Sequence, residues 1–94
     1  NRAMARKRRT VYIGDQRWKI SRDRRLRTKY GECDYGSRTI RICASLRGLD
    51  LLDTLIHEML HARWPDLHEE AVEEFAATLA GFLEAEGFQR QEDE

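Results

Sequence analysis

Three residues near the middle of the chain have the types and the spacing of a metal-dependent hydrolytic site. His57, Glu58 and His61 form the pattern H-E-x-x-H. On a helix, side chains four residues apart share one face with their Cβ atoms about 6 Å apart, so both imidazoles can bind one ion. Glu58 lies about 100 degrees further round, where its carboxylate can act as a general base toward water. The pattern therefore predicts one Zn²⁺ ion, with Glu58 as the catalytic residue.

The same histidine pair has a plainer interpretation, as two ordinary helix residues beside a surface glutamate. His57 follows Ile56 and His61 follows Leu60, so the pair lies at the margin of the predicted apolar face. A half-buried position of this kind suits a metal site better than a solvated surface, and the context favours the metal.

A third protein ligand must come from outside this pattern, because two histidines leave a zinc site incomplete. The acidic segment after Pro65 offers the candidates His68, Glu69, Glu70, Glu73 and Glu74. Glu69 lies three residues before Val72 and seven before Ala76, along the apolar stripe of a predicted helix, so we expect it to be the ligand. His68 is the rival, because imidazole is as good a zinc ligand as carboxylate.

Further roles are predicted for residues near this ion. Glu73, four residues after Glu69, borders the same stripe, and we expect it to accept a hydrogen bond from a ligating histidine. Tyr35 and His68 are the candidates for stabilising an oxyanion. The other glutamates of the segment are interpreted as a solvated helix face: Glu70, Glu74, Glu84 and Glu86.

Two helices are expected to position these side chains. The first runs from residue 49 or 50 to residue 63, and Pro65 ends it. The second runs from residue 66 or 67 to residue 86, and Gly87 follows as a natural C′ residue. One buried stripe is predicted on the second helix, made of Val72, Phe75, Ala76, Leu79, Phe82 and Leu83.

Short strands are predicted ahead of the helices, which makes the fold class α+β. Residues 10–13 and 18–20 have strand character around the turn Gly14-Asp15. Residues 39–43 alternate, with Ile40 and Ile42 on one face and with Thr39, Arg41 and Cys43 on the other. The very basic segment 22–29 has no apolar period and is interpreted as a loop or a short helix.

The length of 94 residues predicts a single domain. We assign it to residues 10–87, between a basic leader at 1–9, expected to be disordered, and an acidic tail at 88–94. Asn1-Arg2-Ala3 before Met4 is interpreted as the remnant of a tag. A signal peptide has an apolar run after its basic start, and this chain has none. No segment reaches the roughly 18 apolar residues that a membrane span needs.

Two cysteines are weak support for a disulfide framework. If the chain turns near Gly36-Ser37, Cys33 faces residue 40 and Cys43 faces residue 30, so the two sulfur atoms do not meet. We therefore expect reduced thiols and a cytoplasmic protein.

The net charge of zero hides an uneven distribution of charge. Residues 1–47 hold 15 Lys and Arg against 4 Asp and Glu, a balance of +11, and residues 48–94 hold 2 against 13, a balance of −11. The basic residues within 2–47 are a candidate surface for nucleic acid. The competing interpretation is that the two halves neutralise each other across the surface of one domain.

The segment from Tyr30 to Ala62 contains G-E-C-D-Y, R-T-I-R-I and L-I-H-E-M-L-H-A, and it resembles the core of SprT-like zincins. In that family a strand with Cys and Asp and an I-x-I strand lead into the H-E-x-x-H helix. The resemblance implies a small zincin-like domain, in which a short twisted antiparallel or mixed sheet packs on the H-E-x-x-H helix and on a second, C-terminal helix. It also implies that an edge strand of this sheet takes substrate backbone in extended form. The hairpin around Cys33–Cys43 is the candidate edge, with Thr39, Arg41 and Cys43 as its residues.

The following E-E-A-V-E-E-F-A resembles the second helix of minimal gluzincins such as the ImmA/IrrE-type peptidases, where E-x-x-A-(N/D)-x-F-A provides a glutamate ligand. Matching Phe75-Ala76 to that pattern implies Glu69 as ligand and Glu73 behind it. Val72 and Glu73 depart from the pattern's small residue and its amide or aspartate. The likeness covers about residues 10–86, and the chain is similar to small phage and prophage proteins of this form.

Two hypotheses follow for the function. The first is a zinc-dependent metallopeptidase that hydrolyses peptide bonds, and the SprT-like resemblance implies DNA-associated protein substrates. The second is a non-catalytic, zincin-like nucleic-acid-binding module with a structural metal. Glu58 favours the first, because a structural site has no use for a base, and a structural zinc is usually closed by four protein ligands.

Overall fold

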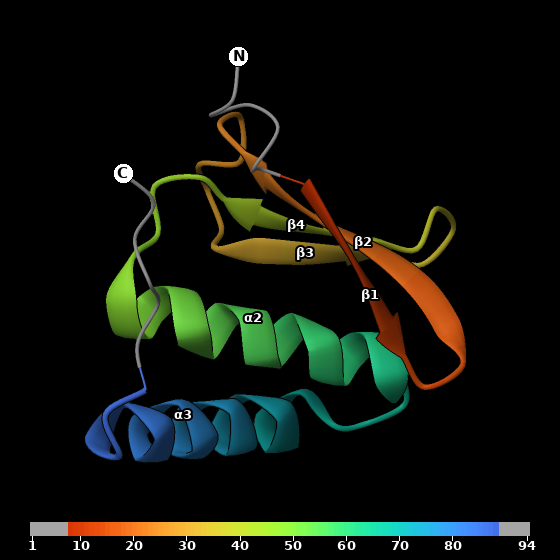
Figure 1. The fold of residues 1–94 in the computed structure, drawn as a ribbon. Coiled ribbons are helices and arrows are strands. Elements are labelled where there is room, and N and C mark those ends of the chain that lie inside the picture. The colour runs from red at the N-terminus through yellow and green to blue at the C-terminus, as the bar shows by residue number, and fades with distance from the viewer. Residues whose placement is uncertain (1–7, 89–94) are drawn as a thin grey trace.

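The computed structural model describes residues 8–88, which form an α+β domain in three layers: a four-stranded sheet, then a helix, then a second helix (Figure 1). Its elements in chain order are β1 (Arg8–Ile13), β2 (Gln16–Asp23), β3 (Gly31–Asp34), β4 (Thr39–Cys43), α2 (Gly48–Arg63) and α3 (Glu69–Ala85). The expected leader and tail lie outside the described residues, except that Arg8 and Arg9 begin β1 and Phe88 follows α3.

The sheet is mixed, with the strand order β1-β2-β4-β3. β1 pairs antiparallel with β2, and β3 pairs antiparallel with β4, while β2 and β4 run parallel. β4 is therefore an inner strand, and the prediction that Thr39, Arg41 and Cys43 line a sheet edge is wrong. The physical reason is burial: Ile40 and Ile42 are both fully buried, and the middle of the sheet is where a strand can bury most apolar surface. The free edge next to β4 belongs to β3.

The main core lies between the sheet and α2. Trp18 of β2 packs there at 2% exposure, together with Ile40 and Ile42 of β4, and Leu51 and Ala62 close the core from α2. These side chains alternate along their strands with exposed or half-buried ones, as a sheet covered on one face requires. This packing fixes the position of α2, and with it the H-E-x-x-H residues, relative to the sheet.

The second interface joins α3 to α2. Val72, Ala76 and Ala80 recur every four residues on α3 and are fully buried. Small side chains in this row let the two helix backbones approach closely. Phe75 and Phe82, predicted to be buried in the same stripe, are 52% and 57% exposed. That prediction is wrong because α3 is the outermost layer and is covered by α2 on one narrow side only (Figure 1).

The two cysteines are free, as expected from the hairpin register. Cys33 pairs with Ile40, and the N–H of Cys43 donates to the carbonyl of Tyr30, so the sulfur atoms lie at different levels of the sheet. The left-handed residue of the turn is Arg38, with a φ of 51°.

A glycine ends the second helix as predicted. Gly87 has a φ of 94°, its N–H donates to the Glu84 carbonyl, and the N–H of Phe88 donates to the Leu83 carbonyl. This pair of bonds is a Schellman cap, which needs a left-handed residue. At its other end α3 begins at Glu69 rather than at 66 or 67, because the residues after Pro65 form a turn.

Gly31 in β3 is the point where the sheet edge and α2 approach most closely. A Cβ atom built there would lie 2.9 Å from Cγ2 of Thr54 and 3.2 Å from Cγ of Glu58. Only a residue without a side chain lets the strand lie this close to the helix that carries H-E-x-x-H.

Gly31→Ala should therefore lower the free energy of unfolding by about 1–3 kcal/mol, the usual cost of overpacking. Gly81→Ala is the matched control, since a Cβ at Gly81 meets nothing within 4 Å and alanine favours a helix by about 0.5–1 kcal/mol. Urea unfolding of both variants measures the difference. Equal stability of the two variants would contradict the close approach.

Candidate metal centre

Two helices bring the candidate ligands together. α2 ends where the Trp64 N–H donates to the Leu60 carbonyl at 2.8 Å, and the Leu67 N–H then donates to the Trp64 carbonyl at 3.1 Å. This short turn reverses the chain. The carbonyl of His68, the N-cap residue, accepts the N–H of Val72 at 3.1 Å, so the first turn of α3 begins beside the last two turns of α2.

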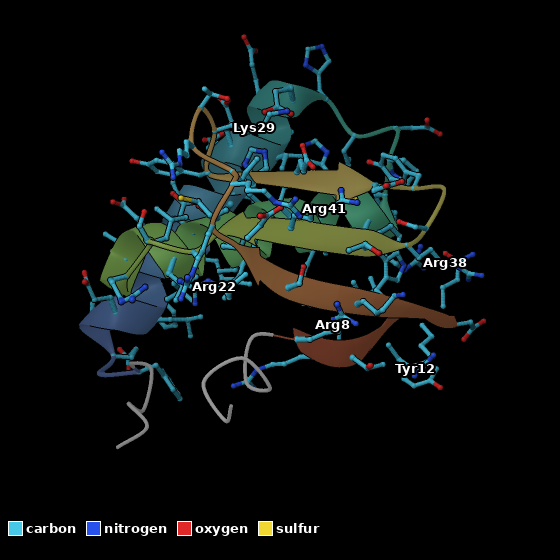
Figure 2. The ribbon with its side chains drawn as sticks, turned by 90° about the horizontal axis from the view of Figure 1, so that it is seen from above. Arg8, Tyr12, Arg22, Lys29, Arg38 and Arg41 are labelled. Carbon is cyan, nitrogen blue, oxygen red and sulfur yellow. The ribbon has the colours of Figure 1, made fainter. Side chains whose placement is uncertain are left out.

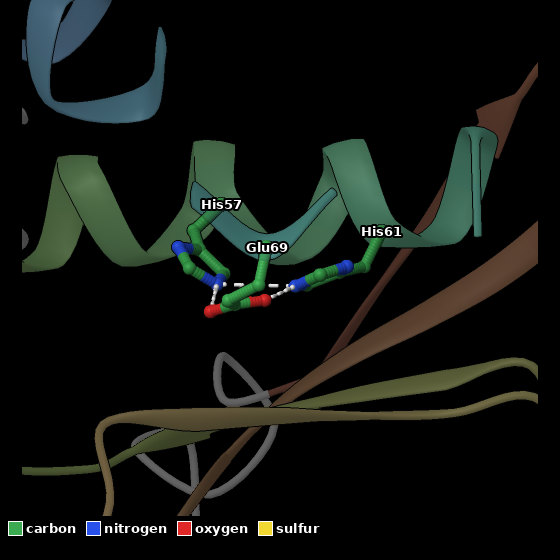
Figure 3. A group of neighbouring side chains, drawn as sticks. All are labelled: His57, His61 and Glu69. Carbon is green, nitrogen blue, oxygen red and sulfur yellow. Dashed lines mark hydrogen bonds and ion pairs between the residues drawn. The ribbon is translucent and has the colours of Figure 1, made fainter. Parts of the chain in front are cut away.

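The side chains of His57, His61 and Glu69 converge on one point (Figure 3). The Nε2 atoms of the two imidazoles lie 3.2 Å apart. Oε1 of Glu69 lies 2.9 Å from Nε2 of His61, and Oε2 lies 3.3 Å from Nε2 of His57. The imidazole side chains are 20% and 18% exposed and the carboxylate 56%, so the group is open to solvent on one side.

These distances fit a small divalent cation. A tetrahedral zinc ion holding two imidazoles at about 2.0–2.1 Å separates their nitrogens by about 3.3 Å, and the observed separation is 3.2 Å. A hydrogen bond between the two ring nitrogens would join only those two atoms. A cation can accept lone pairs from both imidazoles and from the carboxylate at the same time. Two imidazoles and one carboxylate are also ligands that zinc accepts.

Glu58 lies on the same helix but is turned into the protein. Its side chain is buried, at 7% exposure, close to Gly31 of β3. Burial raises the pKa of Glu58, the neighbouring His57 and His61 oppose that rise, and Glu69 and Glu32 add to it. A carboxylate with a raised pKa holds a proton more readily than an exposed one, which is the property a general base needs.

A cleft of about 410 Å³ opens beside this group. Its walls come from α2, α3 and the start of β3, and the lining residues are Lys29, Tyr30, Gly31, Asp53, Thr54, His57, Glu58, Glu69 and Glu73. Glu58 and two of the candidate ligands thus line one space with the free edge of the sheet.

Five of these lining residues were given no role from the sequence: Lys29, Tyr30, Gly31, Asp53 and Thr54. Asp53 lies four residues before His57, so helical spacing alone places it on the histidine face. Lys29 and Tyr30 carry no such signal, because their position depends on how the loop after β2 folds back to β3.

The structure brings Glu69, and not the rival His68, to the histidine pair. His68 is exposed at the N-cap of α3 and is not part of the converging group. Glu73 is exposed and lines the cleft together with His57. Its role as acceptor of a histidine N–H stays a prediction, as does a role for His68 at an oxyanion.

Tyr35 is held by a contact that does not face the cleft. Its hydroxyl donates to the backbone carbonyl of His61 at 3.1 Å, and its ring meets Trp18 edge-on with centroids 6.1 Å apart. Burial raises the pKa of Tyr35 to about 12, so the hydroxyl stays a donor at neutral pH. In this arrangement Tyr35 ties the β3–β4 turn to α2, and the geometry gives no support to its predicted role as an oxyanion stabiliser.

No protein-family model, curated protein or solved structure matches the chain. Neither helix of the described residues has the length and apolar character needed to cross a membrane. The resemblance to SprT-like zincins and minimal gluzincins therefore stays a prediction.

Metal binding is tested first by changing the third ligand. Glu69→Gln should weaken Zn²⁺ affinity more than about 100-fold, since even changes behind the ligands cost about 10–100-fold. Wild-type protein should gain about 2.7 kcal/mol of stability at free zinc 100 times the dissociation constant. Calorimetric titration and thermal unfolding with and without zinc measure both effects.

Glu70→Gln and His68→Ala are the matched controls for this titration. Both residues neighbour Glu69 at the start of α3 and are exposed, so both variants should bind zinc as the wild type does. A loss of affinity in His68→Ala with retention in Glu69→Gln would reverse the assignment of the third ligand.

The buried carboxyl of Glu58 predicts a pH-dependent stability in metal-free protein. Its pKa is raised above its ordinary value of 4.5 on folding, so its contribution to stability is full below that value and is lost as the pH rises through the folded-state pKa. Glu58→Gln, which cannot ionise, should therefore be more stable than wild type at pH 7, and the difference should vanish near pH 4.

Thermal unfolding in the presence of a chelator measures this difference. Glu70→Gln, at an exposed position, should show no such dependence on pH. A Glu58→Gln variant that is less stable than the wild type at pH 7 would show that the carboxylate is stabilised, and not penalised, by its surroundings.

Proposed function

We propose that this protein is a zinc-dependent metallopeptidase of minimal gluzincin type. The observation that carries the proposal is the convergence of His57, His61 and Glu69 within 4.8 Å of one another, beside the buried carboxylate of Glu58. Two imidazoles, one carboxylate and an adjacent base are the protein groups that metal-assisted hydrolysis requires.

Each group has a separate task in this proposal. His57, His61 and Glu69 hold the ion, which supplies Lewis acidity and lowers the pKa of coordinated water toward about 7. Glu58 accepts a proton at its carboxylate and later donates it to the leaving amine. Its burial excludes bulk water from the carboxylate and keeps it in one position.

The edge of the sheet suits a substrate in extended form. β3 is bonded to β4 on one side only, so the outer backbone groups of the strand are free to pair with another strand. Its first residue, Gly31, lines the cleft with His57 and Glu58. A peptide added along β3 would carry its backbone past these groups, with main-chain hydrogen bonds as the source of affinity.

A non-catalytic module with a structural metal is the second candidate. Structural zinc sites are usually closed by four protein ligands, whereas the group found among residues 8–88 has three. The desolvation of Glu58 is also unexplained by a purely structural ion, because a buried carboxylate lowers stability. Both observations favour catalysis.

Glu58→Gln tests the proposal because it removes the base and leaves the three ligands intact. Peptide hydrolysis should fall at least about 100-fold, while zinc affinity stays within a few fold. The measurement is mass-spectrometric cleavage of an unfolded protein mixture by zinc-loaded enzyme. Glu70→Gln, at an exposed position of α3, is the control and should retain activity. Cleavage by Glu58→Gln at the wild-type rate would overturn the proposed mechanism.

A further inference from the structure

One face of the sheet is left uncovered by the two helices. Both lie on the same side of the sheet (Figure 1), and Figure 2 looks down on the opposite side. Trp18, Ile40 and Ile42 point to the helices and are buried. The residues that alternate with them therefore point to the open side.

The β1–β2 half of this open face is basic. Its outward residues form three cross-strand pairs: Arg8 with Ser21, Thr10 with Lys19, and Tyr12 with Arg17. Three of the six are cations and none is acidic. We call these six residues the β1–β2 face. The Cα atoms of Arg17 and Lys19, two residues apart on one strand, are about 7 Å apart, a spacing comparable with that of successive phosphates in an extended nucleic-acid strand.

The other half of the open face differs, because its charges are already paired. Arg41 of β4 donates to Glu32 at 3.0 Å and to Asp34 at 3.3 Å. These bonds neutralise the β3–β4 half, so the excess positive charge is confined to the β1–β2 half.

The basic surface continues beyond the strands into the loop after β2. Arg24 and Arg27 are exposed there, and the loop leaves β2 at the end where Arg8 begins β1, since Arg8 pairs with Ser21. Between the face and this loop lies Asp23 of β2, whose carboxylate accepts the Arg25 N–H at 2.9 Å and lies 3.8 Å from the Arg25 guanidinium. The loop therefore adds cations at the Arg8 end of the sheet. Within residues 8–88 the acidic residues lie mainly on α2 and α3, on the helix side.

An aromatic ring lies on the β1–β2 face. Tyr12 is 68% exposed on the outward side of β1, next to Arg17, and Figure 2 shows it with Arg8 at the far end of the same strand. An exposed ring on a flat sheet face offers a surface on which a base can stack. The face carries no exposed aliphatic side chain, which distinguishes it from a surface that enters a lipid bilayer.

We propose that the β1–β2 face binds single-stranded nucleic acid. Arg8, Arg17 and Lys19 contact phosphates, and Tyr12 stacks on a base. A single strand is favoured over a duplex because its bases are accessible to a ring on a flat surface. The candidate ligands His57, His61 and Glu69 lie on the helix side of the sheet, so this surface and the metal centre are separate and can be tested separately.

Binding of a fluorescent single-stranded oligonucleotide, followed by anisotropy over a range of salt concentrations, tests the proposal. The double variant Arg17→Glu and Lys19→Glu should weaken binding at least about tenfold in 0.1 M salt. It should also reduce the slope of log K against log salt by about 1.4, because each lost phosphate contact on a single strand accounts for about 0.7. Tyr12→Ala should weaken binding roughly tenfold with the slope unchanged, because stacking is not ionic.

The control double variant is Arg9→Glu with Arg63→Glu, which changes the net charge by the same four units. Arg9 alternates with Arg8 and so points to the helix side, and Arg63 ends α2. The control should keep near-wild-type affinity. Equal weakening by the two double variants, no binding by the wild type, or binding to duplex in preference to single strand would each overturn the proposal. Circular dichroism confirms that every variant is folded.

Discussion

The packing of α3 on α2 is the contact on which the candidate metal centre depends. His57 and His61 lie on one helix and Glu69 on the other, so the three side chains converge only at a particular separation of the two helices. Val72, Ala76 and Ala80 form a fully buried row at this interface, and a row of small side chains permits a close approach. Replacing any of them by a larger residue would move Glu69 away from the histidines, even though none of the three belongs to the converging group.

A buried carboxyl beside the converging side chains lowers the stability of the metal-free protein. Two imidazole nitrogens lie 3.2 Å apart beside the carboxylate of Glu69. Close to them, burial raises the pKa of Glu58. A small domain has little stability to spare for such an arrangement. Binding of a divalent ion to the folded state would offset this cost, and so would couple metal binding to folding. The sheet beneath α2 and the close contact at Gly31 keep the histidine helix in place meanwhile.

The local features of the fold were readable from the sequence because each rests on a short-range rule. Alternation predicted β4 with Ile40 and Ile42 buried, and the hairpin register correctly kept Cys33 and Cys43 apart. The errors concern contacts between elements. Phe75 was expected in the core because it shares a helical stripe with Ala76, yet it is 52% exposed, because periodicity reports which face is apolar and not how much of it a neighbour covers. β4 was expected at the sheet edge and is an inner strand. The residue pattern of a single strand does not determine which strands pair with it.

The sequence by itself determined the chemistry available to this protein: H-E-x-x-H on one helix, a glutamate four residues beyond Pro65, and a basic half followed by an acidic half. These depend on residue type and helical spacing, which are local. Only the tertiary structure decided that Glu69 and not its neighbour His68 reaches the histidines, and that β3 is the free edge beside the cleft. It also decided that Arg8, Arg17 and Lys19 share one half of the open sheet face while Arg41 neutralises the other. Each is a relation between elements distant in the chain, and such relations are set by the packing of the whole domain.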